Sequence, residues 1–165
     1  MLLKAITRLV APVLILAFLH GCSQPAAAPD VSFTTLDGQT RQLSSLKGKV
    51  VLVNFWATTC TTCVAEMPKL IETYNKFAPK GFETVAIAMD YDPPEYVRNY
   101  AQKNGLPFTV ALDSGGKAAK GFEDVRLTPT TFLLDKQGRI VQKYLGEPDF
   151  AKLHALLDKL LAEPA

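Results

Sequence analysis

Residues 50–70 read VVLVNFWATTCTTCVAEMPKL, and this stretch decides the fold. Its first seven residues form an apolar run rich in β-branched side chains, which is typical of a strand buried on both faces of a sheet. Over residues 64–77 apolar side chains recur at helical spacing, and Pro68 predicts a kink in that helix. Cys60 and Cys63 lie where the strand gives way to the helix. The stretch therefore predicts an α/β domain with a cysteine pair at the start of a helix.

On both sides of this stretch, apolar runs alternate with amphipathic segments. Asp37-Gly38 supplies the turn of an opening hairpin, and residues 135–138 supply the turn of a closing one. The order of elements predicts an α/β fold with a central mixed sheet, helices on both faces and an N-terminal β-hairpin extension. The remaining expected elements are strands at 31–35, 40–43, 82–89, 108–112, 131–134 and 140–145, and helices at 95–103 and 150–160.

The position of the cysteine pair indicates thiol-disulfide exchange. A sulfur at a helix N-terminus faces unpaired backbone N–H groups and the positive end of the helix dipole, which lower a cysteine pKa from about 8.5 to roughly 3.5–7.5. Cys60 is therefore the expected nucleophile. Cys63 lies one turn further along the same face, close enough to form a disulfide and to resolve a mixed disulfide with substrate. This chemistry requires no cofactor.

Other kinds of site also use paired cysteines. A zinc site needs two further ligands, and outside the pair the chain has only Cys22, His20 and His154, so no metal is expected. A structural disulfide is allowed in an exported protein, but it would close only a short loop. A thiol peroxidase with Cys60 as its peroxidatic cysteine and Thr59 as a hydrogen-bonding neighbour is the alternative function. A copper chaperone typically needs a histidine beside the cysteines, and His154 is badly placed for that.

The N-terminus is interpreted as a lipoprotein export signal. Lys4 and Arg8 supply positive charge, and the uncharged run over residues 9–19 is shorter than the about 20 apolar residues that span a bilayer. The sequence Leu19-His20-Gly21-Cys22 resembles the lipobox of bacterial lipoproteins, although His20 departs from the usual small or hydroxyl residue. Residues 1–21 are therefore expected to be removed, leaving Cys22 as the lipidated first residue.

This signal predicts a domain held in the bacterial periplasm by a lipid anchor, with the choice between inner and outer membrane left open. Residues 22–30 contain two prolines and no apolar periodicity, so they are expected to form a flexible tether ahead of a domain at 31–165. The alternative is an ordinary signal peptide that is cleaved near residues 26–28 and discards Cys22.

The charge balance gives no support for a nucleic-acid partner. The whole chain has 18 basic and 16 acidic side chains, and removal of Lys4 and Arg8 with the signal leaves 16 of each. No basic stretch is interleaved with aromatic residues. The exported domain is thus expected to bind no nucleic acid.

Two separated motifs carry a family resemblance. Residues 55–63, FWATTCTTC, followed by Pro68, and residues 127–133, LTPTTFL, together resemble thioredoxins, most closely the TlpA/ResA-like exported branch. The resemblance covers residues 31–161 and implies a thioredoxin-like fold for the domain. It also implies that Pro129 follows a cis peptide bond opposite the cysteines.

The resemblance assigns further roles around the cysteines. The Thr128 backbone and Pro129 are implied to dock an extended substrate segment by strand-like pairing, and Trp56 is implied to flank the site, shape its surface and help to dock substrate. Asn54 stands where many cytosolic thioredoxins have a buried, titratable aspartate, so a carboxylate serving Cys63 would come from elsewhere. Two candidates for that proton relay are Asp90 and Asp92, and solvated loop carboxylates are the competing interpretation.

Two further departures concern the immediate neighbours of the cysteines. Thr59 replaces a second tryptophan that commonly precedes the nucleophile, so the surface that meets substrate is expected to be smaller or more polar. Glu66, three residues after Cys63, is interpreted as a partner of the helix dipole in the first turn.

The resemblance implies a monomeric reductant of exported protein thiols and disulfides. In this family the domain is typically recharged by a membrane thiol transporter and acts, for example, on apocytochromes c before haem attachment. Thr61 and Thr62 lack the histidine that strongly oxidising relatives place between the cysteines, which favours a reducing role.

Overall fold

The strand at the centre of the protein is Val50–Trp56 (β3), and all seven of its residues are buried. The computed structural model describes residues 25–164. β3 pairs in parallel with Phe82–Ala88 (β4) and antiparallel with Thr130–Leu134 (β6). The prediction of a strand covered on both faces is confirmed, because helices or loops pack against each side of it.

Within residues 25–164 seven strands form one mixed sheet in the order β2-β1-β5-β4-β3-β6-β7. The N-terminal hairpin belongs to this sheet, because β1 pairs antiparallel with β5. The other strands are Ser32–Thr35 (β1), Thr40–Gln42 (β2), Thr109–Leu112 (β5) and Ile140–Leu145 (β7). The α-helices are Thr61–Phe77 (α1), Pro94–Asn104 (α2), Lys117–Gly121 (α3) and Phe150–Ala162 (α4), and 3-10 turns cover Leu43–Leu46 and Ala78–Lys80.

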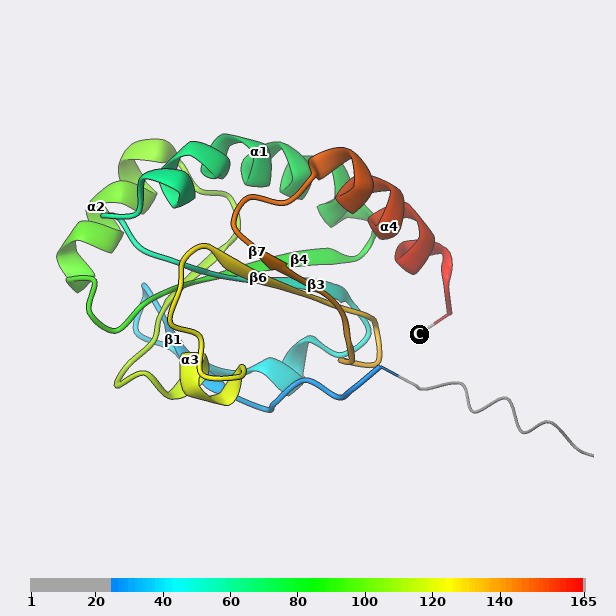
Figure 1. Ribbon diagram of the computed structural model, residues 1–165, viewed down its shortest axis with the longest axis horizontal. Helices are drawn as coiled ribbons and strands as arrows, with labels where there is room; N and C mark the ends of the chain where they lie inside the picture. Colours follow the sequence, from blue (N-terminus) through cyan, green and yellow to red (C-terminus); the bar gives the residue numbers. More distant parts are fainter. Residues whose placement is uncertain (1–24, 165) are drawn as a thin grey trace, which may run out of the picture.

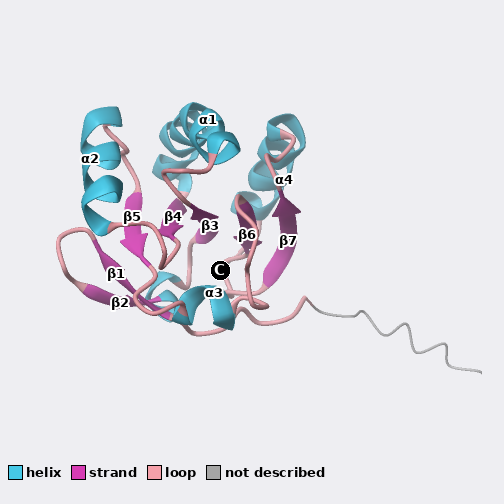
Figure 2. Cartoon of the chain, turned by 60° about the vertical axis from the view of Figure 1, so that its left-hand side comes forward, coloured by secondary structure: helices cyan, strands magenta, loops and turns pink. Residues whose placement is uncertain are grey.

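The helices lie on both faces of the sheet, as expected. Helices α1, α2 and α4 cover one face, and α3 lies on the other side beside β1 (Figures 1 and 2). Alternate residues of β3 serve the two sides: Trp56 packs in the core under α1, α2 and α4, and Phe55 packs in the core under α3. Phe122 joins Phe55 and Phe132 there, with ring centroids 5.5 and 4.8 Å away respectively. The expected α/β architecture with a central mixed sheet is therefore confirmed.

Helix α1 continues through Pro68 from Thr61 to Phe77 without a break, and the kink expected at Pro68 stays a prediction. One local feature differs from the sequence-based expectations. Helix α3 is absent from the expected elements, because five residues are too few to show helical periodicity. The buried carboxylate of Asp113 accepts hydrogen bonds from the backbone N–H groups of Ala118 and Ala119, both at 2.8 Å, and thereby stabilises the start of this short helix.

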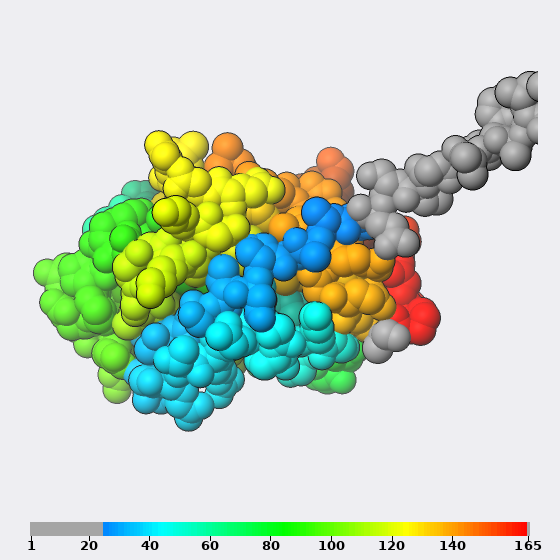
Figure 3. All heavy atoms as spheres, turned by 90° about the horizontal axis from the view of Figure 1, so that it is seen from below, coloured from blue at the N-terminus to red at the C-terminus, as the bar shows by residue number. Residues whose placement is uncertain are grey.

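The end of the expected tether lies against the domain. Ala28 N donates to Gly138 O at 2.9 Å, and Ile140 N donates to Ala26 O at 2.8 Å, so this segment runs beside the start of β7. Asp30 accepts a hydrogen bond from Ser44 N at 3.0 Å. Figure 3 shows this N-terminal segment, in blue, lying across the surface of the domain. The prediction of a flexible tether therefore does not hold for residues 26–30, because this segment is hydrogen-bonded to the domain.

The predicted signal peptide, residues 1–21, and the lipidation site Cys22 lie outside the described residues. Among residues 25–164, no helix combines the length and the apolar character needed to cross a membrane.

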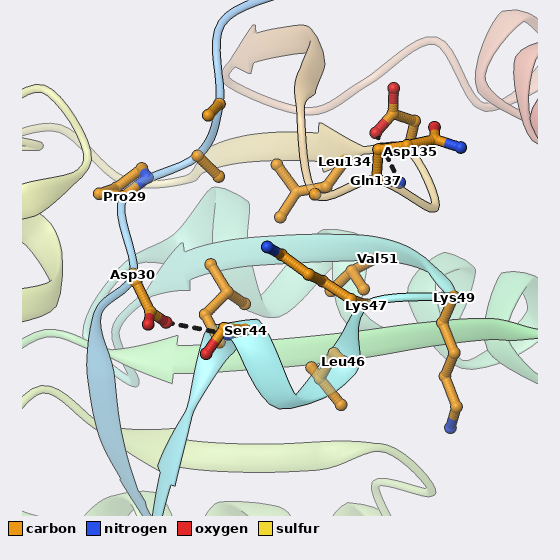
Figure 4. Close-up of a pocket in the computed structure, with 14 residues that line it drawn as sticks. Pro29, Asp30, Ser44, Leu46, Lys47, Lys49, Val51, Leu134, Asp135 and Gln137 are labelled. Atoms are coloured by element: carbon orange, nitrogen blue, oxygen red, sulfur yellow. Dashed lines mark hydrogen bonds between the residues drawn. The ribbon is translucent and has the colours of Figure 1, made fainter. Parts of the chain in front are cut away.

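Residues 27–30 of the N-terminal segment form part of the wall of a small cavity of about 120 Å³ near the start of β3. Leu43, Leu46, Val51 and Leu134 give it apolar walls, and the Lys47 side chain extends across it (Figure 4). The cavity lies near the first residues of β3, whereas the cysteines follow the last ones, so it belongs to the opposite end of the sheet.

Gly121 provides a test of how the N-terminal segment packs. A Cβ at this position would lie 2.6 Å from Val31 Cγ1 and 3.7 Å from Pro29 Cβ. We expect Gly121→Ala to lower the free energy of unfolding by about 1–3 kcal/mol, because the added methyl group overfills a packed contact. Urea unfolding would measure this change. Lys120→Ala, an exposed substitution one residue away, should change it by less than about 0.5 kcal/mol, and an equal loss in both variants would contradict the proposed contact.

Candidate active site

Cys60 and Cys63 form a disulfide at the first turn of α1, with their Cα atoms 5.2 Å apart. Cys60 is the N-cap residue of the helix, and its Sγ accepts a hydrogen bond from Cys63 N at 3.2 Å. The pair therefore lies where β3 ends and α1 begins, which we call the cysteine end of the sheet. The unpaired N–H groups of the first helical turn face this position.

The two sulfurs differ in their access to solvent. Cys60 is half-buried, whereas Cys63 is 0% exposed. A substrate disulfide can approach only a sulfur at the surface, so the geometry supports Cys60 as the attacking thiolate. Cys63 is placed to attack Cys60 from inside the protein.

The loop before β6 lies at the same end of the sheet. The Thr128–Pro129 peptide bond is cis, and the next residue, Thr130, pairs with Phe55 near the end of β3. Gly146 N donates to Pro129 O at 2.8 Å, which ties this loop to the end of β7. Pro129 is buried and Thr128 is half-buried, so Thr128 is the more accessible of the two. Their role in docking substrate stays a prediction.

Trp56 does not lie on the surface of the site. Its side chain is 0% exposed and packs against Tyr100, with ring centroids 5.3 Å apart. The expectation that Trp56 docks substrate is therefore corrected: as the last residue of β3, it faces the core under α1, α2 and α4. Trp56 therefore belongs to the core at the cysteine end of the sheet.

The two candidate relay carboxylates occupy different environments. Asp90 is exposed, whereas Asp92 is 3% exposed. Asp92 accepts hydrogen bonds from Thr58 N and from Thr58 Oγ1, each at 2.6 Å. Because Thr58 occupies both of its oxygens, Asp92 is bound to the turn that precedes Cys60 rather than directed at Cys63.

A buried carboxyl group lies one helical turn after Cys63. Glu66 is 0% exposed, and its Oε1 accepts a hydrogen bond from Asn54 Nδ2 at 2.9 Å. The same amide nitrogen donates to Thr131 Oγ1 at 2.9 Å, which links α1 to β3 and β6. Glu66 Oε2 and Asn54 Oδ1 have no hydrogen-bond partner among the described residues.

Burial dominates the ionisation of Glu66. Loss of hydration raises the pKa of this carboxyl to about 7, against the opposing effect of the hydrogen bond from Asn54. The charge of Glu147 also raises the pKa, and that of Lys69 lowers it; these two residues form an ion pair with each other. Glu66 can therefore both bind and release a proton near neutral pH.

Glu66, like Trp56, is a residue whose environment the sequence interpretation gives wrongly. A dipole partner in the first turn would have an exposed side chain, and this one is buried. The spacing holds a usable signal, because Cys63, Glu66 and Leu70 follow one another at helical intervals along the buried face of α1. A carboxylate in that register lies under the helix, beside the second cysteine.

Comparison with known proteins agrees with this geometry. The Redoxin family matches residues 24–157. The thiol-disulfide oxidoreductase ResA of Bacillus cereus is 42% identical over 134 residues, covering 81% of this chain and 76% of that protein. ResA of Bacillus subtilis (strain 168) is 33% identical over 132 residues, covering 80% and 73%.

Solved structures show the same fold. The solution structure of a putative thioredoxin from Neisseria meningitidis has a TM-score of 0.75 and 42% identity, and the match covers 83% of this chain and 91% of that one. A putative thiol:disulfide interchange protein DsbE from Chlorobium tepidum has a TM-score of 0.77 and 28% identity, with 84% and 97% covered. The thioredoxin-like fold and the resemblance to ResA-like proteins are thereby confirmed. The chain belongs to the Redoxin family and is a thiol-disulfide oxidoreductase of the thioredoxin fold, with Cys60 and Cys63 as its redox-active pair.

Proposed function

We propose that this protein reduces disulfides in exported proteins, as the thiol-disulfide oxidoreductases ResA and DsbE suggest by their likeness to it. The observation that carries the proposal is the half-buried Cys60 at the N-terminus of α1, joined to a fully buried Cys63. Thr61 and Thr62 lie exposed between them and add no charge that would stabilise a thiolate. A reducing role is therefore favoured over an oxidising one, with apocytochrome c before haem attachment as an example of a substrate.

The reaction begins from the dithiol form. The Cys60 thiolate attacks one sulfur of the substrate disulfide, and the other substrate sulfur leaves as a thiolate and takes up a proton. Cys63 then loses its proton and attacks Cys60 Sγ, which releases the second substrate sulfur. The substrate gains two electrons and two protons, and the Cys60–Cys63 disulfide forms.

Glu66 is the proposed acceptor of the Cys63 proton. Cys63 has no exposed surface through which water could take the proton directly. A carboxyl group one turn away with a pKa of about 7 is ionised in a useful fraction of molecules at neutral pH. Two protons and two electrons from a donor dithiol then restore the starting form.

The cellular setting follows from the N-terminal sequence. We propose that the signal at 1–21 exports the chain, that Cys22 anchors it by lipid to the inner or outer membrane, and that residues 31–165 act as a monomer in the periplasm. A membrane thiol transporter is the proposed electron donor, and Thr128 and Pro129 are proposed to dock the substrate segment.

The reduction potential tests the direction of electron flow. Equilibration of the domain with defined glutathione mixtures is expected to give a potential near those of reducing relatives, roughly −200 to −270 mV. A value near about −120 mV, typical of a strong oxidant, would reject the reductant role. Rapid consumption of peroxide with a sulfenate on Cys60, and little reduction of insulin disulfides, would indicate the peroxidase instead.

A further inference from the structure

We propose that Asp92 is a positioning residue for Cys60: it holds the turn before the nucleophile and makes the thiolate form of Cys60 less favourable. This inference rests on the proposed role of Cys60 as the attacking cysteine. Asp92 lies in the loop between β4 and α2. Because β4 runs parallel to β3, this loop emerges at the cysteine end.

Two hydrogen bonds from Thr58 to Asp92 hold the turn at residues 57–59 in place. Residues 57–59 connect the end of β3 to Cys60, and Cys60 N donates to Ala57 O at 3.1 Å to close the turn. Within it Thr59 is exposed, whereas Thr58 gives both its backbone N–H and its hydroxyl to Asp92. Asp92 itself is held by a hydrogen bond from its N–H to Met89 O at 3.0 Å. The position of Cys60 relative to the helix N-terminus therefore depends on a side chain from a different loop.

The negative charge of Asp92 disfavours the thiolate form of Cys60, whereas the N-terminus of α1 favours it. Among residues 25–164, no Lys or Arg side chain forms an ion pair with Asp92, and its side-chain partners are the two Thr58 donors, both neutral. A poorly hydrated carboxylate that is bonded to the turn before Cys60 disfavours a second negative charge on the cysteine. Destabilising the thiolate destabilises the reduced form of the site, so the disulfide is favoured and the domain becomes a stronger reductant.

Other titratable groups on the surrounding elements are differently placed. Asp90 in the same loop and Glu95 in the first turn of α2 are exposed, so water screens their charges. Asp113 at the end of β5 is buried, but its carboxylate is bound to the start of α3. Glu66 is buried under α1 and is bound to Asn54. Asp92 is thus the buried carboxylate that is bonded directly to the Cys60 turn.

The test compares Asp92→Asn with Asp90→Asn, which removes the same charge from an exposed position in the same loop. The pH dependence of Cys60 alkylation by iodoacetamide would be followed in a Cys63→Ser background. In Asp92→Asn we expect the midpoint to fall by about one pH unit, whereas Asp90→Asn should stay within about 0.3 unit of the parent.

The equilibrium with glutathione gives a second readout in the chain with both cysteines. The reaction is protein disulfide plus two glutathione thiols going to protein dithiol plus glutathione disulfide. At a pH above both alkylation midpoints, Asp92→Asn is expected to move this equilibrium toward the dithiol by about tenfold. A purely structural role would not change the equilibrium and the alkylation midpoint together in this direction.

Threonine variants keep the proposal testable if Asp92→Asn does not fold. Thr58→Val removes the hydroxyl that donates a hydrogen bond to Asp92. Without this bond the carboxylate charge should repel the Cys60 thiolate more strongly and raise the alkylation midpoint. Thr58→Ser keeps a hydroxyl and should give the parent profile. Parent-like midpoints in both Asp92→Asn and Thr58→Val, with native circular dichroism, would overturn the proposal. An oxidising potential in the parent chain would reject the reductant role but leave the shifts between variants as the separate test of Asp92.

Discussion

Cys60→Ala is expected to abolish thiol-disulfide exchange, whereas Cys63→Ala should trap substrates as mixed disulfides. The half-buried Cys60 is the sulfur that a substrate can reach, and the buried Cys63 can act only on Cys60. Without Cys60 no covalent intermediate forms. Without Cys63 the intermediate forms but is not resolved, because no other cysteine is present in residues 25–164.

The measurement combines insulin reduction with nonreducing gel analysis of trapped partners. Cys60→Ala should lower the rate to that of the uncatalysed reaction, and Cys63→Ala should accumulate adducts that disappear with dithiothreitol. A Thr61→Ala control, which alters an exposed residue between the cysteines, should retain exchange. If Cys60→Ala captured the same partners as well as Cys63→Ala does, the roles assigned to the two sulfurs would be reversed.

Glu66→Gln is expected to make the protein more stable above neutral pH and slower in exchange. The glutamate pKa rises from 4.5 to about 7 on folding because the carboxyl loses its hydration. Between these values the unfolded chain has released the proton while the folded protein still binds it. Stability therefore falls as pH rises from about 4.5 to about 7, and this destabilisation is then complete, at about 3 kcal/mol.

The amide of the Glu66→Gln variant has no proton to release in this pH range. The contribution of residue 66 to the pH dependence of stability therefore disappears. Urea unfolding at several pH values should show the variant and the parent converging near pH 4.5 and diverging by up to about 3 kcal/mol at about pH 8. Glu72→Gln, an exposed change on the same helix, is the matched control and should follow the parent. Parallel curves for the parent and Glu66→Gln would mean that the raised pKa is absent.

The kinetic arm of the same experiment follows resolution of a preformed mixed disulfide between Cys60 and a peptide. Loss of the base is expected to slow resolution by about 100-fold at about pH 7 and to remove its rise with pH around neutrality. The opposite signs of the two effects separate a catalytic carboxyl group from a structural one. A variant that was both less stable and slower would instead point to a packing defect.

The fold was predictable because its strongest signals are local. The apolar run of β3 and the helical periodicity of α1 are each written in consecutive residues, and the cysteines mark the junction between them. Helix α3 escaped prediction because its five residues are too few to show helical periodicity. The docking of residues 26–30 was missed for a different reason, since the partners of its backbone, Gly138 and Ile140, lie near the other end of the chain.

The sequence by itself determined the chemistry of this protein: two cysteines three residues apart, at the start of a helix that follows a buried strand. Only the tertiary structure decided which carboxyl groups are buried near that junction and what they bind. Asp92 reaches Thr58 across the end of the sheet, and Glu66 meets Asn54 beneath α1. The physical reason is that the pKa of a carboxyl group and the conformation of a turn depend on burial and on partners from other elements. Residue spacing does not encode burial or these partners.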